Sequence, residues 1–369
     1  MKVKIGDITK IKTGKLDANA SSEDGEYPFF TCSKEPLRIS TYSYDCECVL
    51  VAGNGDLNVK YYNGKFDAYQ RTYIIEDNSD GRLFMPYLYY FMEGYVEELR
   101  KQAIGGVIKY IKLGNLTDAM IELPDVEIQK KIVNILSKTK GVLDSRSHQI
   151  DMLDNLIKAR FVELFGNPIK NEKYWDTFRL GDCLKRIDNG KSFICKGRAR
   201  IGEQPAILKL SAVTYGDYRP DENKALLDEK QFIDFAEIHE GDLLFTRKNT
   251  PELVGMAAYV HKTPAKLMMP DLIFRLVPNE RMTAIFLWQL INNQEFRPVI
   301  QSIAGGSAKS MSNISKERLS NISVICPPIN EQIKLNEIVF QVDKSKVVVQ
   351  KAFDETQMLY DSLLQEFFG

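Results

Sequence analysis

The sequence predicts an α/β (α+β) chain of two tandem mixed α/β globules, each followed by a long helix, with the helices paired as an antiparallel coiled coil of pseudo-twofold symmetry. Three observations predict it: an internal repeat, short apolar runs bounded by turn residues, and two glycine-poor segments with apolar residues three or four positions apart. A length of 369 residues suits two or three domains. The composition, 44% hydrophobic and 27% charged, excludes a disordered, collagenous or disulfide-framework chain.

The internal repeat is plainest at the two ends of each copy. The opening segment Val3–Lys15 returns as Phe178–Lys191, and both contain a Gly-Asp pair and a closing Gly-Lys. Further matches are Gly105 with Gly305, Leu116 with Leu319, Pro124 with Pro327, Gln129 with Gln332 and Ile135 with Ile338. The separation between the copies grows from 175 to 203 residues, so the second copy carries 28 extra residues in its middle.

The middle of each copy predicts β-strands followed by a helix. Apolar runs rich in β-branched and aromatic residues and bounded by Gly, Asn and Asp are typical of strands. Two pairs of runs align, Val49–Val51 with Leu243–Phe245 and Tyr73–Ile75 with Phe274–Leu276. A helix is expected to begin near Pro86 in the first copy and near Thr283 in the second.

The end of each copy predicts a long helix. Between Asp125 and Gly166 there is no proline and one glycine, Gly141. Apolar residues recur there in steps of three and four, as in the seam of a coiled coil: Ile128, Ile132, Ile135, Val142, Ile150, Leu153, Ile157, Phe161 and Leu164. The second copy repeats the seam at Leu335, Ile338, Val342, Val349, Leu359, Leu363 and Phe367. At ~1.5 Å per residue each helix is about 60 Å long.

The two helices are expected to pair with each other, because each must bury its apolar stripe. Only the ten residues Asn167–Asp176 join the first helix to the second globule. A parallel pair would need a linker as long as the helix, so an antiparallel pair is predicted, with equivalent faces meeting. The predicted segments are a globule at 1–123, a helix at 124–168, a globule at 169–326 and a helix at 327–369.

The common catalytic patterns are missing from the sequence. It contains neither G-x-G-x-x-G nor G-x-x-x-x-G-K-[ST], which excludes a Rossmann turn and a phosphate loop. Three histidines and six scattered cysteines suggest no metal shell and no nucleophile with a partner base. We therefore expect a chain without catalytic residues, metal or cofactor. We also expect a cytoplasmic protein, since no apolar run is long enough for a membrane span.

The expected arrangement suits DNA. The net charge is −3 for residues 1–123 and +4 for residues 169–326, which leaves nucleic-acid binding open. Two globules at opposite ends of a coiled coil can each face a separate stretch of duplex, whose turns recur about 34 Å apart. Because the middles of the globules differ, the two half-sites should differ. The target would then be asymmetric and bipartite, with a spacer set by helix length.

The sequence resembles a known family, the specificity subunit of type I restriction-modification systems. The resemblance covers the whole chain and rests on the order of its motifs in two tandem copies. They are Ile5-Gly6-Asp7, Leu180-Gly181-Asp182, Gly241–Arg247, Val254-Gly255, Gly305–Ser307 and Pro327–Gln332. The first copy departs from the pattern at Leu123–Gln129, which keeps one proline and the glutamine.

The resemblance implies that the globules are target recognition domains for double-stranded DNA. The helices would be spacers on which two methyltransferase (modification) subunits dock, and restriction (translocase and endonuclease) subunits would be further partners. S-adenosylmethionine, ATP and Mg²⁺ would belong to the partners, which carry adenine N6 methylation and DNA cleavage in host defence. The alternatives are a stand-alone DNA-binding protein, which would not copurify with a methyltransferase, and a nuclease with metal-dependent cleavage.

Loop residues of both globules are candidates for DNA contact, because Arg, Lys, Asn and Gln read base edges while Lys, Arg, Ser and Thr bind phosphates. The candidates in the first globule are Asn54, Asn58, Lys60, Lys65, Gln70, Arg71 and Lys109. Those in the second globule are Arg247, Lys248, Asn249, Thr250, Ser307, Lys309 and Ser310. Leu136, Val347 and Val348 are expected to face outward and dock partner subunits, unless they belong to a wider helix core.

Overall fold

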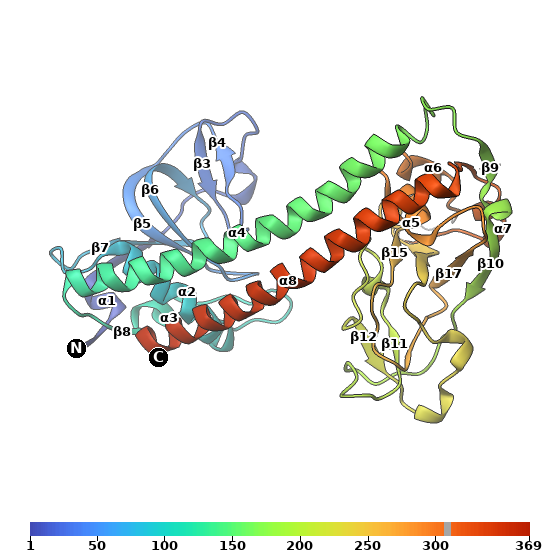
Figure 1. Ribbon diagram of the computed structural model, residues 1–369. Coiled ribbons are helices and arrows are strands. Elements are labelled where there is room, and N and C mark those ends of the chain that lie inside the picture. Colours follow the sequence, from blue (N-terminus) through green and yellow to red (C-terminus); the bar gives the residue numbers. More distant parts are fainter. Residues whose placement is uncertain (306–310) are drawn as a thin grey trace. The chain divides into compact units, whose positions relative to one another are not determined.

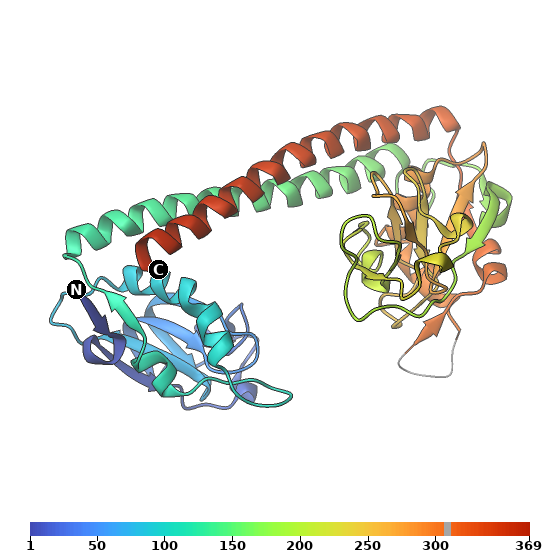
Figure 2. The same cartoon turned by 90° about the horizontal axis from the view of Figure 1, so that it is seen from below.

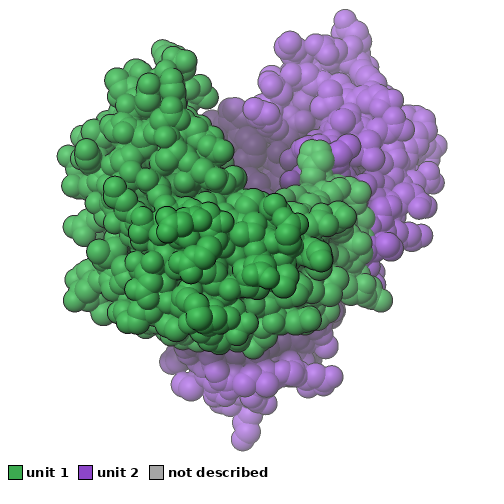
Figure 3. Space-filling model, turned by 90° about the vertical axis from the view of Figure 1, so that its left-hand side faces the viewer, with its two compact units in different colours: residues 1–149, 349–369 green, residues 150–348 purple. Residues whose placement is uncertain are grey.

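The chain forms two compact units in the computed structural model, which describes residues 1–305 and 311–369 (Figures 1 and 3). Unit 1 consists of residues 1–149 and 349–369, and unit 2 consists of residues 150–348. Each unit therefore contains one globule, one part of the first long helix and one part of the second.

Unit 1 is built on a six-stranded sheet of order β2-β7-β5-β6-β3-β4. Its elements are β1 (Lys2–Lys4), α1 (Ile5–Ile8), β2 (Thr9–Thr13), η1 (Ala18–Ala20), β3 (Tyr27–Phe30), β4 (Leu37–Ile39), β5 (Tyr44–Ala52), β6 (Val59–Ala68), β7 (Thr72–Asp77), α2 (Met85–Gln102), α3 (Leu113–Thr117) and β8 (Met120–Glu122). Strand β5 is buried on both faces: Val49 and Val51 pack in the core that contains Leu88 of α2, and Leu50 packs with Phe66 in a second core.

Unit 2 has a four-stranded sheet of order β10-β17-β13-β15, a three-stranded sheet β12-β11-β16 and two short ribbons. Its elements are β9 (Thr177–Arg179), η2 (Leu180–Cys183), β10 (Leu184–Asn189), β11 (Ala206–Leu208), η3 (Leu210–Ala212), β12 (Asn223–Ala225), η4 (Glu229–Gln231), η5 (Asp234–Ala236), β13 (Leu243–Thr246), β14 (Lys248–Asn249), β15 (Ala257–Tyr259), β16 (Leu267–Met268), β17 (Ile273–Pro278), α5 (Ala284–Asn292), α6 (Arg297–Ser302), β18 (Ser312–Asn313), α7 (Lys316–Ser320) and β19 (Ser323–Ile325).

Strand register confirms the predicted alignment of the two copies. In unit 1, β5 pairs antiparallel with β7 and places Val49 opposite Ile75. In unit 2, β13 pairs antiparallel with β17 and places Leu243 opposite Leu276. These are the residues that the repeat equates, so the two sheets share the same central strand pair.

The two long helices are α4 (Val126–Phe165) and α8 (Ile329–Phe368), each of 40 residues. Within unit 1, the Arg146 guanidinium of α4 donates to the carbonyl of Ala352 and the hydroxyl of Thr356 on α8. Within unit 2, Lys346 Nζ of α8 lies 2.7 Å from Asp154 Oδ1 of α4. Later residues of α4 thus meet earlier residues of α8, and the helices form the predicted antiparallel coiled coil. The predicted seam is wrong at Ile128, Ile135, Val142 and Leu359, which are 43–53% exposed, because each helix turns these positions away from its partner.

Helix α2 connects the globule of unit 1 to both long helices. The Glu93 carboxylate of α2 accepts from the Tyr360 hydroxyl of α8 (2.5 Å) and from the Lys140 ammonium of α4. Burial, followed by the bond to Glu93, raises the pKa of Tyr360. The phenol therefore stays a neutral donor, and the cluster fixes the helix pair against the globule.

A buried glutamine joins each globule to the start of its long helix. Gln129 and Gln332 are both fully buried. The side-chain amide oxygen of Gln129 accepts from the Phe84 N–H (2.8 Å). Its amide nitrogen, Nε2, donates to the carbonyls of Arg82 and Pro124. Gln332 makes the equivalent three bonds, with Thr283, Arg281 and Pro327. The repeated glutamine is thus a structural joint, because a buried backbone group needs a partner.

Glycine in the repeated Gly-Asp pair is required by close packing. A Cβ on Gly6 would lie 2.9 Å from the Cβ of Thr117, and one on Gly181 would lie 3.0 Å from the Cβ of Ser320. Only glycine lets these turns pack so closely against the segment that precedes the last strand of each globule.

Candidate nucleic-acid interface

The loop that follows β5 gathers candidate residues from three parts of unit 1. The Gly53 N–H donates to the carbonyl of Arg71 (2.8 Å), and the Gly55 N–H donates to the carbonyl of Lys109 (3.0 Å). Asn54, Arg71 and Lys109 therefore lie in one cluster of loops. We call residues 53–58, 69–71 and 104–110 the first loop cluster.

Asn58 and Lys60 hold the first loop cluster to a neighbouring segment. The Asn58 amide donates to the carbonyls of Cys32 and Asp56, both at 2.8 Å. The Lys60 ammonium donates to the Ser33 carbonyl (2.7 Å) and to the Asn58 side chain. Burial lowers the pKa of Lys60. These polar groups have partners within the protein, so the structure gives both residues a positioning role.

Lys65 and Gln70 differ in their relation to this cluster. Lys65 lies opposite Asp45 in the β5–β6 pair, with its ammonium 4.7 Å from the centre of the Tyr42 ring. It makes none of the hydrogen bonds described above for the cluster. Gln70 directly precedes Arg71, and its amide donates to Asp17 Oδ1 (2.8 Å).

Unit 2 builds the equivalent cluster from the same positions of the repeat. Strand β14 pairs with β18, which places Lys248 opposite Asn313. The Ile314 N–H donates to the Arg247 carbonyl (2.8 Å), as the Ile111 N–H donates to the Gly53 carbonyl (2.9 Å) in unit 1. We call residues 247–250, 305 and 311–313 the second loop cluster. The candidates Ser307, Lys309 and Ser310 lie outside the described residues.

The side chains of the second loop cluster have distinct roles. Arg247 donates from Nε and Nη2 to Asn313 Oδ1 (3.3 and 3.2 Å), and its guanidinium lies 4.9 Å from the centre of the Phe274 ring. Lys248 is half-buried and Thr250 is exposed. The expected role of Asn249 in DNA contact is corrected, because this side chain is buried and donates to Thr214 Oγ1 (3.1 Å).

One arginine in each unit holds a loop that follows the central strand by donating to its backbone carbonyls, and neither was among the candidates. Arg297 of α6 donates to the carbonyls of Gly255 and Val254, both at 2.7 Å. Arg100 of α2 donates to the Leu57 carbonyl (3.1 Å). Burial lowers the pKa of Arg297. No local pattern indicates these roles, since each arginine lies 42 or 43 residues away from its acceptors in the sequence.

The three expected docking residues separate into two groups. Val347 and Val348 are 55% and 68% exposed on α8. The prediction that Leu136 faces outward was wrong: it is fully buried between the helices, in a cluster with Leu143 and Tyr360. The spacing of apolar residues along α4 does not reveal that Tyr90 of α2 covers the side of the helix that carries Leu136.

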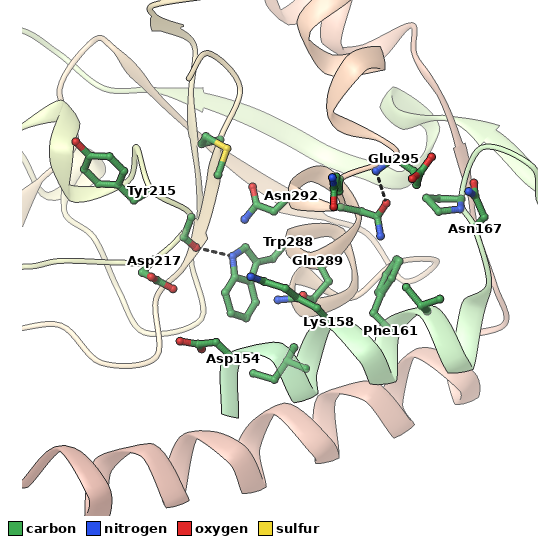
Figure 4. A pocket seen from close by; sticks show the side chains of 17 residues that line it. Asp154, Lys158, Phe161, Asn167, Tyr215, Asp217, Trp288, Gln289, Asn292 and Glu295 are labelled. Atoms are coloured by element: carbon green, nitrogen blue, oxygen red, sulfur yellow. Dashed lines mark hydrogen bonds between the residues drawn. The ribbon is translucent and has the colours of Figure 1, made fainter. Parts of the chain in front are cut away.

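A cavity of about 580 Å³ in unit 2 lies between the end of α4 and helix α5 (Figure 4). Its lining includes Asp154, Lys158, Asp217 and Trp288, whose indole N–H donates to the Gly216 carbonyl (2.9 Å). Burial raises the pKa of Asp217. The lining mixes both signs of charge without the convergent donors that a specific small ligand requires.

Among the residues that the structure describes, no three His, Cys, Asp or Glu side chains are grouped so that they could hold a metal ion. None of the described helices is both long enough and apolar enough to span a bilayer.

Comparison with known proteins identifies the family. The family model for the type I restriction modification DNA specificity domain matches residues 1–151 and 172–352. The EcoDI type I restriction enzyme specificity subunit of Escherichia coli is 36% identical over 156 residues, which are 42% of this chain and 34% of that protein. The EcoEI specificity subunit of the same organism is 31% identical over 195 residues, 51% of this chain and 33% of that protein. The chain thus spans about a third of the length of these two relatives.

Solved structures show the same fold. The type I restriction-modification S subunit from M. genitalium matches with a TM-score of 0.60 and 17% identity, covering 100% of this chain and 96% of that chain. A structure of a type I restriction-modification system matches with a TM-score of 0.51 and 16% identity, covering 100% and 97%. Because the family model covers most of its residues in two matched stretches, this chain belongs to the family of type I restriction-modification DNA specificity subunits.

Proposed function

We propose that this specificity subunit recognises an asymmetric bipartite DNA site, with one half-site bound by each globule. The observation that carries the proposal is that one loop cluster is built twice with different side chains. Gly53 and Arg247 occupy the same hydrogen-bonded position in the two units, and so do Ile111 and Ile314. A shared scaffold with different side chains suits two different half-sites.

Exposed and half-buried side chains of the two loop clusters fit direct readout of bases. Arg71 and Asn54 in the first loop cluster can form paired hydrogen bonds with guanine and adenine edges, respectively. Lys109 beside them suits a phosphate. In the second loop cluster, Asn313 and the Phe274 ring support Arg247 from two sides, which lowers the entropy lost when the guanidinium meets a base. Lys248 and Thr250 of the same cluster suit contacts to phosphates.

We further infer that methyltransferase subunits dock on the coiled coil. Helix α8 exposes apolar side chains seven residues apart, at Ile333, Phe340 and Val347, and Val348 continues this surface. Helix α4 exposes Ile128, Ile135 and Val142 at the same interval. A seven-residue apolar repeat left uncovered on a helix suits packing by a helix from a partner. The chain would act without a catalytic site of its own, and S-adenosylmethionine, ATP and Mg²⁺ would be bound by the methyltransferase and restriction subunits.

Coexpression with the associated methyltransferase tests the proposal. We expect a complex of one copy of this chain with two methyltransferase subunits, measured by native mass spectrometry. Sequencing that detects methylated adenines should then show one split, asymmetric site. A chain that stays alone and leaves the DNA unmodified would instead indicate a stand-alone DNA-binding protein.

A further inference from the structure

The loop between α2 and α3 of unit 1 carries an apolar tip in full contact with solvent. Val107 is 104% exposed, Ile108 is 62% exposed and Ile104 is 44% exposed. The loop projects from the globule as the teal segment that follows α2 (Figure 2). Large aliphatic side chains gathered at an exposed tip suggest a surface that is covered when the protein acts.

The backbone of this loop is fixed at its base. Ile104 and Tyr110 exchange two backbone hydrogen bonds, of 3.0 and 2.9 Å. Gly105 has a φ of +118°, and a Cβ there would lie 2.6 Å from the carbonyl oxygen of Ile108. The sequence therefore favours a tight turn that holds Val107 and Ile108 away from the core of the globule.

The surroundings of the tip identify what would cover it. The loop belongs to the first loop cluster, because the Lys109 carbonyl accepts from the Gly55 N–H (3.0 Å). The exposed side chains of Lys109 and Arg71 lie in that same cluster. Aliphatic side chains next to cationic groups are the combination by which proteins wedge between base pairs while binding the phosphates. If a protein rather than DNA covered the tip, we would expect the apolar surface to continue beyond the tip.

The second copy differs at this loop in its sequence. Gly305 and Asn313 exchange the backbone bonds that Ile104 and Tyr110 exchange in unit 1, both at 2.8 Å. Between Gly305 and Met311 the side chains are small or polar: Ser307, Ala308, Lys309 and Ser310. Neither valine nor isoleucine occurs there, and the loop ends in one methionine, Met311, which is 49% exposed. The adjacent pair of branched aliphatic side chains is therefore a property of the first copy alone.

We propose that Val107 and Ile108 insert between adjacent base pairs of the half-site bound by unit 1 and unstack them. The proposal rests on the proposed function, since it assumes that the first loop cluster faces DNA. It adds that only one of the two half-sites is distorted. Specificity at that half-site would then include the cost of opening a particular base step, which depends on sequence even where no base edge is read.

The test uses the full chain in complex with its methyltransferase and a duplex that carries its methylation site. 2-Aminopurine, whose fluorescence rises when it is unstacked, is placed at successive positions of both half-sites, leaving out the adenine that is methylated. We expect a rise at one step of one half-site, and its loss in the double variant Val107→Ser, Ile108→Ser. That variant should also bind the duplex roughly tenfold more weakly. The control is Leu37→Ser, which removes an aliphatic side chain of 42% exposure from β4 of the same unit.

The outcomes separate the wedge from the proposed function. Specific binding without unstacking, or unstacking that survives in the double variant, would overturn the wedge and leave the proposed function intact. Loss of the methyltransferase from the double variant would show that the tip docks a protein, which also overturns the wedge. Failure of the wild-type complex to bind any methylated site specifically would overturn both. The wedge is supported only if the double variant keeps its partner and loses the signal while Leu37→Ser retains it.

Discussion

At the scale of single residues, the buried glutamines at the helix starts carry large local stability. Replacing Gln332 by leucine keeps the volume but leaves the Thr283 N–H and the Pro327 carbonyl without their partner. The Arg281 carbonyl also loses Gln332 but keeps its contact with Cys326 Sγ (3.4 Å). Each buried group left unpaired costs about 1–3 kcal/mol. We expect the free energy of unfolding of unit 2 to fall by about 3 kcal/mol or more, as measured by urea denaturation. Gln350→Leu, at an exposed position of α8, is the control and should change it little.

His261 predicts how the stability of unit 2 depends on pH. Its Nδ1 lies 3.5 Å from Asp343 Oδ2, and Lys346, Asp217 and Glu240 also act on it, but burial is the largest effect and lowers its pKa. The unfolded chain then binds the proton more readily, so this stability is present above the ordinary value of 6.5 and is lost as pH falls through the lowered pKa.

Thermal denaturation between pH 7.5 and pH 5 checks this prediction. The wild type should lose more stability on acidification than His261→Phe, because the variant has no proton to take up at this position. Asp217 faces the same region and burial raises its pKa, which gives the opposite dependence. The comparison at position 261 isolates the histidine. Equal pH profiles for the two proteins would contradict the assignment.

Residue roles were the part that sequence reasoning predicted least well. Asn249 has the chemistry of a base-reading side chain, yet its partner Thr214 lies 35 residues away in sequence. Leu136 lies outside the predicted seam of α4, yet Tyr90 of α2 and Tyr360 of α8 cover it. Both errors come from contacts between segments that are distant in the chain, which no local pattern encodes.

At the scale of elements, Arg297 and Arg100 each hold a loop by its backbone carbonyls, so we expect them to control the two proposed half-sites independently. If unit 2 binds one half-site as proposed, Arg297→Ala should free the turn at Gly255 and Val254 and weaken binding of that half-site by about tenfold, since one well-placed base contact contributes about 1–3 kcal/mol. Arg100→Ala should act likewise on the half-site read by unit 1.

Binding assays with duplexes altered in one half-site measure this effect. Each variant should lose discrimination only at its own half-site, and Arg297→Lys should restore part of it because lysine can still donate to one carbonyl. A purely structural role would lower thermal stability and affect both half-sites alike. Arg160→Ala, at an exposed ion pair on α4, is the matched control.

The elements themselves were largely predictable, because both copies preserve the residues that make their joints. The central strands, the long helices and the repeated glutamine follow from the aligned sequences. The glycine loops are the exception. The sequence aligns Gly105 with Gly305, whereas the backbone bonds equate Ile104 with Gly305 and Tyr110 with Asn313. The second loop is two residues longer than the first between these paired positions. Aligning the glycines by sequence therefore does not show where each turn begins.

At the scale of the whole molecule, the proposed assembly depends on apolar side chains of the coiled coil that the chain leaves uncovered. Val347→Glu with Val348→Glu places two charges on a surface that is more than half exposed, so the chain should keep its thermal midpoint. A buried charge in an interface is costly unless it is paired, so docking of a methyltransferase there should weaken strongly. Leu136→Glu should instead destabilise the chain itself, because that side chain lies inside the helix pair.

Native mass spectrometry of the coexpressed complexes distinguishes these effects. If two subunits dock on the coiled coil, the valine variant should shift the complex from two methyltransferase copies toward one, since α4 exposes its own stripe at Ile128, Ile135 and Val142. Ser345→Glu adds a charge at an exposed polar position of the same helix and should leave the stoichiometry unchanged. If the valine variant retained two subunits with undiminished affinity, docking would have to use another surface. The coiled coil would then serve only to join the two units.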